Sequence, residues 1–441
     1  MTEAPDCTFN QALLSAWQAE LKATHSAIIK EQGLPQAPDL LPRFTEQYQQ
    51  LKALRRRVRR GLQRQWKRSL AGLALLLALG QAPALAATIN VGGTCTLVRA
   101  INAANNDTTA NGNCTQGSGA DTIVLPANST QTLTSASNPF AGPSGLPVIT
   151  STMTIAGNGS TIARSSAPGT PDFRIFTVDQ NGNLTLRQTT VTGGSLPADQ
   201  SRGGGVYRRS GTLTLIGCTI SSNSASYGGG VFNGSFSGNL TVTNSTVSEN
   251  TATGSQGGGG LFNITNGILT VTNSTISGNT ATFGGGLRND GTATFTNSAI
   301  SGNSASGVNA RGGGMTNAHG SLTLTNSTVS GNTAESGGGG VNNYRGTVIL
   351  TNSTISDNSA SNSGGAANLD GKMSFVNSTV SGNAASDGSG GGASNSLGKM
   401  VFVNSTVSGN TAKQGPQVSF SRGGGVYSGN VSFNLTSIVV L

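Results

Sequence analysis

One short motif recurs through the second half of this 441-residue chain: Asn-Ser-Thr, then Val or Ile, Ser, a variable residue and Asn. Its seven copies, one of them with Ala in place of Thr, begin 24 to 29 residues apart, at Asn244, Asn273, Asn297, Asn326, Asn352, Asn377 and Asn404. A diverged copy begins at Gly217. A unit of this size cannot bury its apolar face alone, so the period predicts a stack of repeated units.

Apolar residues alternate with Thr or Ser inside each unit, as in Leu240-Thr241-Val242-Thr243, and this is strand periodicity. The sequence predicts three strands per unit: one after a glycine cluster, one ending at the first Asn of the motif, and one around its Val or Ile. Pairing each strand with its equivalent one unit later predicts an all-β, right-handed parallel β-helix, a pectate-lyase-like solenoid of about a dozen coils.

The two asparagines of the motif are predicted to stabilise the bends. An inward amide can bond both the turn and the same amide in the next coil. The last Asn of the motif should form one such ladder, comprising Asn223, Asn250, Asn279, Asn303, Asn332, Asn358, Asn383 and Asn410. The first Asn, from Asn244 to Asn404, should form a second. Glycine clusters such as 228–230 lack the Lys-Ser/Thr of phosphate loops, and we expect them to supply positive φ at strand entry.

The net charge of +9 lies mostly at the N-terminal end of the chain. Residues 1–86 hold 12 Lys+Arg and 6 Asp+Glu, which leaves 14 and 11 for residues 87–441. A remaining charge of about +3 removes the main argument for a nucleic-acid partner, so none is predicted.

Residues 1–86 have the order of a helical, extended basic leader with a signal peptide, and Leu13, Leu14, Trp17 and Leu21 have helical spacing. A basic run at 52–68 precedes the apolar stretch Leu70–Gly80 and the small-x-small site Ala84-Leu85-Ala86. Because a bilayer-spanning helix needs roughly twenty residues, we expect cleavage before Ala87 and no transmembrane span in the mature chain. We therefore predict export, to the medium or to the cell surface or outer membrane. An uncleaved anchor with a small cytoplasmic segment stays open as the alternative.

The segment 87–126 is predicted to be an N-terminal cap, followed by β-helix repeats over 127–441. Leu97, Ala100, Ile101 and Ala104 have the spacing of a short amphipathic helix. In an oxidising compartment Cys95 and Cys114 can form a disulfide that closes the loop between them, two buried thiols being the alternative. Cys218 falls where other repeats place Ser, and we expect an inward-facing filler there.

The cap resembles the CSLREA domain, which is found at the start of exported bacterial β-helix proteins. The resemblance rests on Cys95-Thr96-Leu97-Val98-Arg99-Ala100-Ile101, Ala104-Asn105, Cys114 and the segment from Asp121 to Pro126. Val98 and Arg99 replace the Arg and Glu of that family. The repeats resemble those of chlamydial polymorphic outer membrane proteins, through Gly229-Gly230-Val231 and Ser277-Gly278-Asn279. That second resemblance implies surface exposure and adhesion.

Residues for catalysis are sparse in the repeats. The six acids from residue 201 onward occur singly, at Glu249, Asp290, Glu335, Asp357, Asp370 and Asp387. His319 is the only histidine after the leader. Polysaccharide cleavage needs grouped carboxylates, so no catalytic residue, metal ligand or cofactor is predicted. A polysaccharide-active lyase or hydrolase on the same fold is the alternative function.

A row of residues on the strand after the glycines is the predicted binding site. Strand alternation turns Tyr207, Phe232, Phe262, Arg288 and Thr316 outward in successive coils. In line, the aromatic rings can stack a sugar or pack on a protein, or they can stack on one another. Arg208 and Arg209 are expected to be solvated. We therefore predict a non-enzymatic surface protein for adhesion or carbohydrate interaction, with a cell-surface glycan or protein as partner and the oligomeric state left open.

Overall fold

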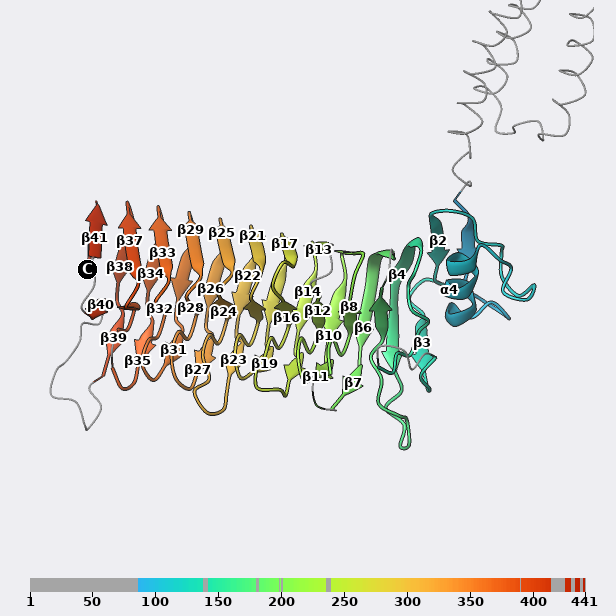
Figure 1. Ribbon diagram of the computed structural model, residues 1–441, viewed down its shortest axis with the longest axis horizontal. Coiled ribbons are helices and arrows are strands. Elements are labelled where there is room, and N and C mark those ends of the chain that lie inside the picture. The colour runs from blue at the N-terminus through green and yellow to red at the C-terminus, as the bar shows by residue number, and fades with distance from the viewer. Residues whose placement is uncertain are drawn as a thin grey trace, which may run out of the picture. The chain divides into compact units, whose positions relative to one another are not determined.

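The computed structural model describes residues 86–413, apart from 138–141, 180–181, 198, 200, 235–238 and 389, together with 425–429, 433–436 and 439–440. Contacts divide the chain into Met1–Ala82 and Pro83–Leu441, and the described residues belong to the second unit. The predicted leader therefore lies outside the described residues except for Ala86. Successive coils of the second unit stack along one axis in chain order (Figure 1).

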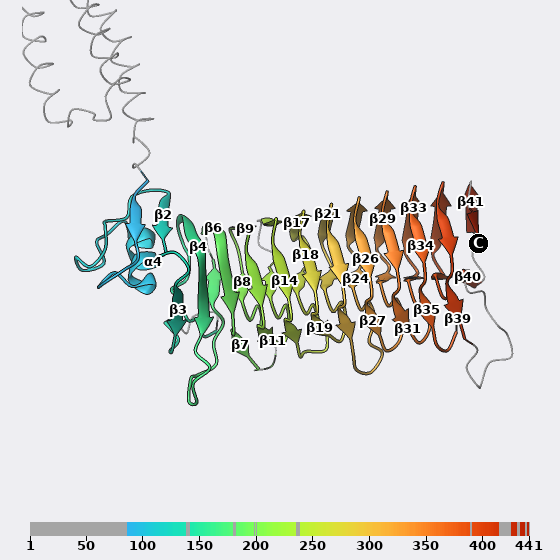
Figure 2. The same ribbon diagram turned by 180° about the vertical axis from the view of Figure 1, so that it is seen from behind.

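The coils form a right-handed parallel β-helix, as predicted. Strands pair in parallel with their equivalents one coil later, in sheets of 23, 10 and 9 strands. The view from behind shows the same stacking of coils (Figure 2). The ten-stranded sheet takes one strand from each coil, so the described residues contain about ten coils and not a dozen.

The 23-stranded sheet consists of β1 (Thr88–Asn90), β2 (Asp121–Val124), β3 (Thr130–Leu133), β4 (Thr152–Arg164), β6 (Asn183–Thr192), β9 (Thr212–Ile216), β10 (Thr219–Ser221), β13 (Asn239–Thr243), β14 (Thr246–Ser248), β17 (Ile268–Thr272), β18 (Thr275–Ser277), β21 (Thr292–Thr296), β22 (Ala299–Ser301), β25 (Ser321–Thr325), β26 (Thr328–Ser330), β29 (Thr347–Thr351), β30 (Thr354–Ser356), β33 (Lys372–Val376), β34 (Thr379–Ser381), β37 (Lys399–Val403), β38 (Thr406–Ser408), β41 (Phe433–Thr436) and β42 (Val439–Val440). From β9 onward each coil contributes two of its strands, with a bend between them.

The ten-stranded sheet consists of β5 (Phe176–Val178), β8 (Val206–Arg208), β12 (Val231–Asn233), β16 (Leu261–Asn263), β20 (Leu287–Asn289), β24 (Met315–Ala318), β28 (Val341–Tyr344), β32 (Ala366–Leu369), β36 (Ala393–Ser396) and β40 (Val426–Gly429). The nine-stranded sheet consists of β7 (Ser195–Leu196), β11 (Ser224–Ala225), β15 (Thr251–Ala252), β19 (Thr280–Ala281), β23 (Ser304–Ala305), β27 (Thr333–Ala334), β31 (Ser359–Ala360), β35 (Ala384–Ala385) and β39 (Thr411–Ala412). Its two-residue strands were not predicted, because two residues are too few to show alternation.

The core is a stack of equivalent apolar side chains. In one coil Val231, Leu240, Val242 and Val247 point inward, and each is at most 1% exposed. Burial of each side chain stabilises the fold by about 25 cal/mol per Å² of apolar surface removed from water. A single coil could not bury these side chains without its neighbours. Burial of this kind, repeated coil after coil, holds the strands in register.

The predicted asparagine ladder of the last motif Asn is confirmed. Nδ2 of Asn250 donates to Oδ1 of Asn279 over 3.0 Å and to the backbone oxygen of Ile220 over 2.9 Å. The backbone nitrogen of Asn250 also donates to Oδ1 of Asn279. The same amide contacts run from Asn223 to Asn410, so these buried amides are satisfied within the row.

The prediction for the first Asn of the motif is wrong. Asn244 and its six equivalents are exposed and adopt φ between 48° and 51°. They form the left-handed bend between the two rows of strands in the 23-stranded sheet, a conformation that Asn tolerates better than most residues. The next residue faces inward instead: the backbone nitrogen of Ser245 donates to Oγ of Ser274 over 3.1 Å. Buried Cys218 occupies this serine row, as expected.

A second asparagine ladder does exist, at the end of the strands in the ten-stranded sheet. It comprises Asn233, Asn263, Asn289, Asn317, Asn343, Asn368 and Asn395, with Nδ2 to Oδ1 distances of 2.6 to 2.9 Å. Fully buried Arg208 occupies the same register position one coil earlier and donates to Oδ1 of Asn233. The predicted solvated Arg208 is therefore wrong, because its guanidinium ends this ladder.

Positive φ accounts for only part of each glycine cluster. Gly228 has φ of 61°, whereas Gly229 and Gly230 do not adopt positive φ. A Cβ on Gly229 would lie 2.3 Å from the backbone oxygen of Thr251, and one on Gly230 would lie 3.0 Å from the Asn250 amide. Neighbouring atoms lie too close to these two positions for a side chain to fit, so Gly229 and Gly230 are needed for close approach of the backbone.

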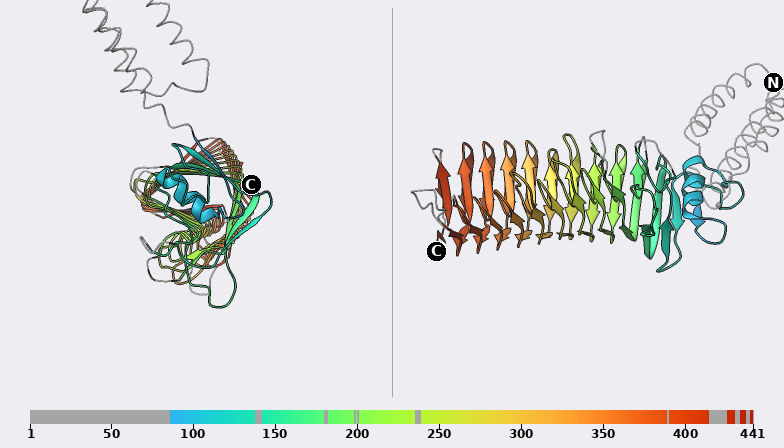
Figure 3. Two further views of the ribbon diagram at one scale, coloured as in Figure 1. Left: turned by 90° about the vertical axis from the view of Figure 1, so that its right-hand side faces the viewer. Right: turned by 90° about the horizontal axis from the view of Figure 1, so that it is seen from below.

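The cap contains the predicted helix, α4 (Leu97–Asn106), which lies across the N-terminal end of the coils (Figure 3). Leu97, Ala100, Ile101 and Ala104 are buried against the first strands. The helix contacts β1 and β2, so it covers strand edges that could otherwise pair with another chain.

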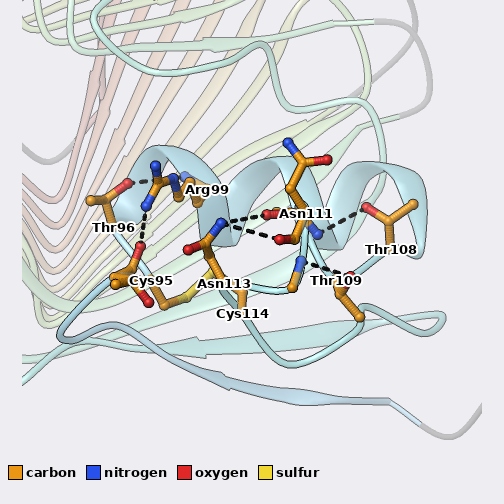
Figure 4. The surroundings of a disulfide bond; sticks show 11 residues. Cys95, Thr96, Arg99, Thr108, Thr109, Asn111, Asn113 and Cys114 are labelled. Carbon is orange, nitrogen blue, oxygen red and sulfur yellow. Dashed lines mark hydrogen bonds between the residues drawn. A yellow bond between two sulfur atoms is a disulfide. The ribbon is translucent and has the colours of Figure 1, made fainter.

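The predicted disulfide joins Cys95 to Cys114, with a Cα–Cα distance of 4.9 Å, and ties the following loop to the start of α4 (Figure 4). Thr96 is the N-cap of α4 and accepts a hydrogen bond from the backbone nitrogen of Arg99. The Arg99 side chain donates to the backbone oxygen of Thr94 over 2.6 Å, so it stabilises the helix start.

Candidate functional site

The predicted binding row lies on the outer face of the ten-stranded sheet, but its first three members are covered. Tyr207, Phe232 and Phe262 pair in register and are 7%, 3% and 3% exposed. Their rings pack edge to face, with centroids 5.6 Å apart for Tyr207 and Phe232 and 5.1 Å apart for Phe232 and Phe262. They form an apolar cluster separate from the core, stabilised by aromatic contacts along the rod. We call this the aromatic row.

An arginine covers each ring of the aromatic row. The guanidinium carbons of Arg174, Arg202 and Arg288 lie 5.1, 5.4 and 5.3 Å from the ring centroids of Tyr207, Phe232 and Phe262, respectively. Burial lowers the pKa of Arg174 to about 10, so its side chain stays cationic at neutral pH. These cation–π contacts occupy the surfaces that a sugar would need for stacking.

Two other arginines near the row are also engaged. Burial lowers the pKa of Arg208 to about 10, and its side chain donates to the backbone oxygen of Gly211 over 2.9 Å. Arg209 forms an ion pair of 2.8 Å with Asp179. The expectation of solvated side chains is therefore wrong for Arg208, while the Arg209 side chain is partly exposed and paired with Asp179.

The outer face opens into a pocket in the next three coils. The pocket has a volume of about 410 Å³ and is lined by Phe283, Arg288, Asn309, Arg311, Thr316, Ala318, Asn342 and Tyr344. Arg288, Thr316 and Asn342 occupy consecutive register positions on β20, β24 and β28, directly after those of the aromatic row. The pocket therefore continues the same face of the same sheet.

Small residues create the hollow. Tyr344 pairs in register with Ala318 of the preceding coil. The small Ala318 side chain leaves a hollow beside the Tyr344 ring, and both residues line the pocket. Phe283, Arg311 and Gly337 pair in sequence just before the glycine clusters. At Gly337 an added Cβ would meet no atom within 4 Å. A bulky row thus ends at Arg311 and leaves the pocket open on that side.

The charge of the pocket is positive. Arg288 is paired with Asp290, at 3.0 Å from Nε to Oδ1, and its Nη1 donates to the backbone oxygen of Gln256. The Arg311 guanidinium has no hydrogen bond or ion pair with the described residues, although its backbone oxygen accepts from Oγ1 of Thr316. Arg311 is thus a half-buried cation whose donors are directed to the pocket or to solvent.

The Tyr344 ring is held by its neighbours. The guanidinium carbon of Arg345 lies 5.0 Å from its centroid, and Arg345 is paired with Asp370 at 3.1 Å. The exposed His319 ring packs edge to face at 5.3 Å. These contacts fix the aromatic wall without filling the pocket.

The lining supplies recognition groups and no acid–base pair. Its eight residues include two aromatic rings, two guanidinium groups, two amides and two hydroxyls, but no carboxylate and no imidazole. Nowhere among the described residues do three or more His, Cys, Asp or Glu gather as a metal site would require. The arrangement can bind a polar ligand with stacking, amide hydrogen bonds and charge.

Two members of the predicted binding row line this pocket, Arg288 and Thr316, while Tyr207, Phe232 and Phe262 lie in the aromatic row. The other lining residues were not predicted as part of a site. The sequence offered two signals. One is the residue before each glycine cluster, which changes from Phe283 and Arg311 to Gly337, and the other is the residue after the ladder Asn, where Ala318 meets Tyr344. Whether these two positions come together in one pocket depends on loops of varying length, whose conformation the motif spacing does not determine.

A family model agrees with the fold over part of the chain. The family model described as the right handed beta helix region matches residues 175–321. The A-module of mannuronan C-5 epimerase AlgE6 from Azotobacter vinelandii is similar in structure at 14% sequence identity, with a TM-score of 0.43, over 78% of this chain and 94% of that chain. No curated protein matches the chain in sequence. Within the described range, no helix is long and apolar enough to cross a bilayer.

Proposed function

We propose that this chain is an exported surface protein that binds acidic glycans, without cleaving them, in the pocket between β20, β24 and β28. The observation that carries the proposal is the Arg311 guanidinium, which lines the pocket and has no partner among the described residues. A planar fork of donors suits a carboxylate or sulfate ester on a sugar, and bidentate pairs of this kind are strong.

The other lining groups fit a sugar ring. Phe283 and Tyr344 offer apolar ring surface for C–H groups, and the amides of Asn309 and Asn342 offer donors and acceptors for hydroxyls. Binding sites for small ligands combine apolar walls with a few placed polar groups in this way. A pocket of about 410 Å³ is in the range for one or two sugar residues.

Features of the sequence and of the cap favour the proposed export and surface location. The leader pattern, the Cys95–Cys114 disulfide and the resemblance to CSLREA-domain and polymorphic outer membrane proteins favour an oxidising, extracytoplasmic compartment. A stacked solenoid presents its outer face as one long surface, which suits adhesion to a polymer. Binding without catalysis fits a lining that lacks carboxylates.

The test is calorimetric titration of protein recovered from the exporting cell with oligogalacturonate and with a neutral cello-oligosaccharide of equal length. The acidic ligand should bind more tightly, and its affinity should fall as salt is raised. Arg311→Gln should weaken acidic binding by about 10- to 100-fold, the range for one charge-assisted hydrogen bond of 1.5–3 kcal/mol.

Lys372→Gln is the matched control, because it removes the same charge from an exposed position on the 23-stranded sheet. It should leave affinity unchanged. Equal binding of both ligands, or full affinity in Arg311→Gln, would refute the assignment of the pocket. Release of cleaved or unsaturated products would instead support the alternative of a polysaccharide-active enzyme.

A further inference from the structure

The cap contains a buried carboxylate that the described contacts leave half satisfied. Asp121 begins β2 and is 1% exposed. Its Oδ1 accepts from the backbone nitrogens of Ala87 at 3.0 Å and Ser118 at 2.8 Å. Its Oδ2 is buried and has no hydrogen-bond partner, the one side-chain oxygen or nitrogen of this kind among the described residues. Leaving a buried charge without a partner is costly, so this carboxylate needs explaining.

The nitrogen of Ala87 is also the nitrogen of the predicted cleavage site. The bond between Ala86 and Ala87 follows the small-x-small pattern at 84–86, and Ala86 is exposed. Just beyond the bond, the chain is anchored: the backbone oxygen of Ala87 accepts from the backbone nitrogen of Thr122 at 2.8 Å, and β1 then pairs with β2. A chain end created at Ala87 would therefore be held beside Asp121.

We propose that cleavage of the Ala86–Ala87 bond frees an α-ammonium group that the Asp121 carboxylate binds, so that leader removal completes the cap. In the cleavage, catalysed by an endopeptidase of the export system, the hydroxyl of water joins the carbonyl carbon of Ala86. The Ala87 nitrogen keeps the electrons of the broken bond and takes a proton from that water. It takes a second proton from solvent near neutral pH, because the pKa of an α-amino group is about 8.

The new end matches what the carboxylate lacks. A peptide nitrogen donates one hydrogen bond, and that bond goes to Oδ1. An ammonium at the same place donates three and carries a positive charge, so it can also reach Oδ2 of the same carboxylate. Ser118 lies between Cys114 and β2, and so the pair would join the chain end, the loop after the disulfide and the first parallel strands.

The inference rests on the export proposed above. Its experiment uses the full-length chain expressed in the exporting cell and recovered from outside it. Intact mass gives the N-terminus, and timed labelling with an amine-selective reagent gives the reactivity of the α-amine. The mature protein should begin at Ala87. Its α-amine should react at least about tenfold more slowly than in Asp121→Asn, because a paired, buried ammonium is shielded and cannot easily lose its proton.

A second variant covers the case in which Asp121→Asn fails to fold. Inserting Gly-Ser between residues 86 and 87 leaves Asp121 intact but moves the new amine by about 7 Å of chain. Its amine should label as fast as that of a flexible peptide. Asp121→Glu, which keeps the charge, should retain more of the protection than Asp121→Asn does.

Each outcome decides a different claim. An N-terminus at another residue, or equal labelling of the wild-type and inserted amines, overturns the Ala87–Asp121 pair while leaving export intact. Recovery of the chain only inside the cell, with residues 1–86 attached, overturns both export and the processing inference. If the recovered protein binds no glycan but its Ala87 amine is shielded, the proposed ligand is wrong and the Ala87–Asp121 pair is supported.

Discussion

The outer face of the ten-stranded sheet is filled by aromatic rings over its earlier coils, the closed region, and has a pocket over its later coils, the open region. Outward residues are buried in both, since Thr316 and Asn342 in the pocket are 3% and 4% exposed. In β8, β12 and β16 the outward residues are aromatic, and an arginine lies over each ring. In β20, β24 and β28 the equivalent positions hold Arg288, Thr316 and Asn342, and a pocket forms. Strand position and backbone pairing are the same in both regions, and from β12 onward the same asparagine ladder lies below both.

The difference shows that the most aromatic stretch of this β-helix face is not where its pocket forms. Rings spaced by one coil are close enough to pack on each other, and long arginine side chains then cover them. A binding pocket forms where bulky and small residues meet, as Tyr344 meets Ala318 and Arg311 meets Gly337. Aromatic residues thus stabilise the closed region and form only the walls of the open one.

Removing a ring from the closed region should have the largest effect, and it should be on stability. Phe232→Ala is expected to lower the free energy of unfolding by about 3 kcal/mol, the lower end for a buried Phe, because its neighbours on both sides lose contacts. Denaturant unfolding measures it. Glycan affinity should stay unchanged, and a large loss of affinity in a folded Phe232→Ala protein would mean that the aromatic row takes part in binding.

Closing the open region should abolish most of the binding without loss of stability. Gly337→Phe extends the bulky row of Phe283 and Arg311 by one coil. Gly337 lacks positive φ and has open space at its Cβ, so the larger side chain brings little strain. Because its ring would occupy the open side of the pocket, we expect affinity to fall by at least about tenfold, or 1.4 kcal/mol, in a titration.

The neighbouring glycine provides the control for that substitution. Gly338 has φ of 63°, and a Cβ there would lie 2.6 Å from the backbone oxygen of Val341. Gly338→Ala should therefore destabilise the fold, whereas Gly337→Phe should not. If Gly337→Phe bound the acidic ligand normally, the ligand would not enter between Arg311 and Tyr344.

The smallest effect is expected for the wall residue Tyr344. Tyr344→Ala should weaken binding by about three- to tenfold, since an aromatic contact contributes roughly 0.5–1.5 kcal/mol. Tyr344→Phe keeps the ring and should retain nearly full affinity. Titration of both variants separates ring stacking from hydroxyl bonding, and a loss in Tyr344→Phe equal to that in Tyr344→Ala would assign the contact to the hydroxyl.

The fold was predictable from the sequence because every coil repeats the same constraints. Alternation in segments such as Leu240–Thr243 identified the strands, and the constant place of Asn250 and its equivalents identified one ladder. The other ladder was assigned to the wrong asparagine. Asn244 adopts positive φ and turns outward, which strand alternation does not describe, while Asn233 sits at a strand end that the motif does not include.

The candidate pocket was predictable only in part. Outward facing of Arg288 and Thr316 follows from alternation, and both line the pocket. Whether an outward residue is covered depends on side chains from other rows, such as Arg202 over Phe232, and on the length of the loop that carries Asn309. Those contacts join residues whose spacing varies from coil to coil, so one sequence does not determine them.

The most direct measurement is a crystal structure of the recovered protein with a short oligogalacturonate. We expect a sugar carboxylate within hydrogen-bond distance of the Arg311 guanidinium and a sugar ring beside Tyr344. A ligand ordered on the 23-stranded sheet or over the aromatic row, with an empty pocket at Arg311, would contradict it.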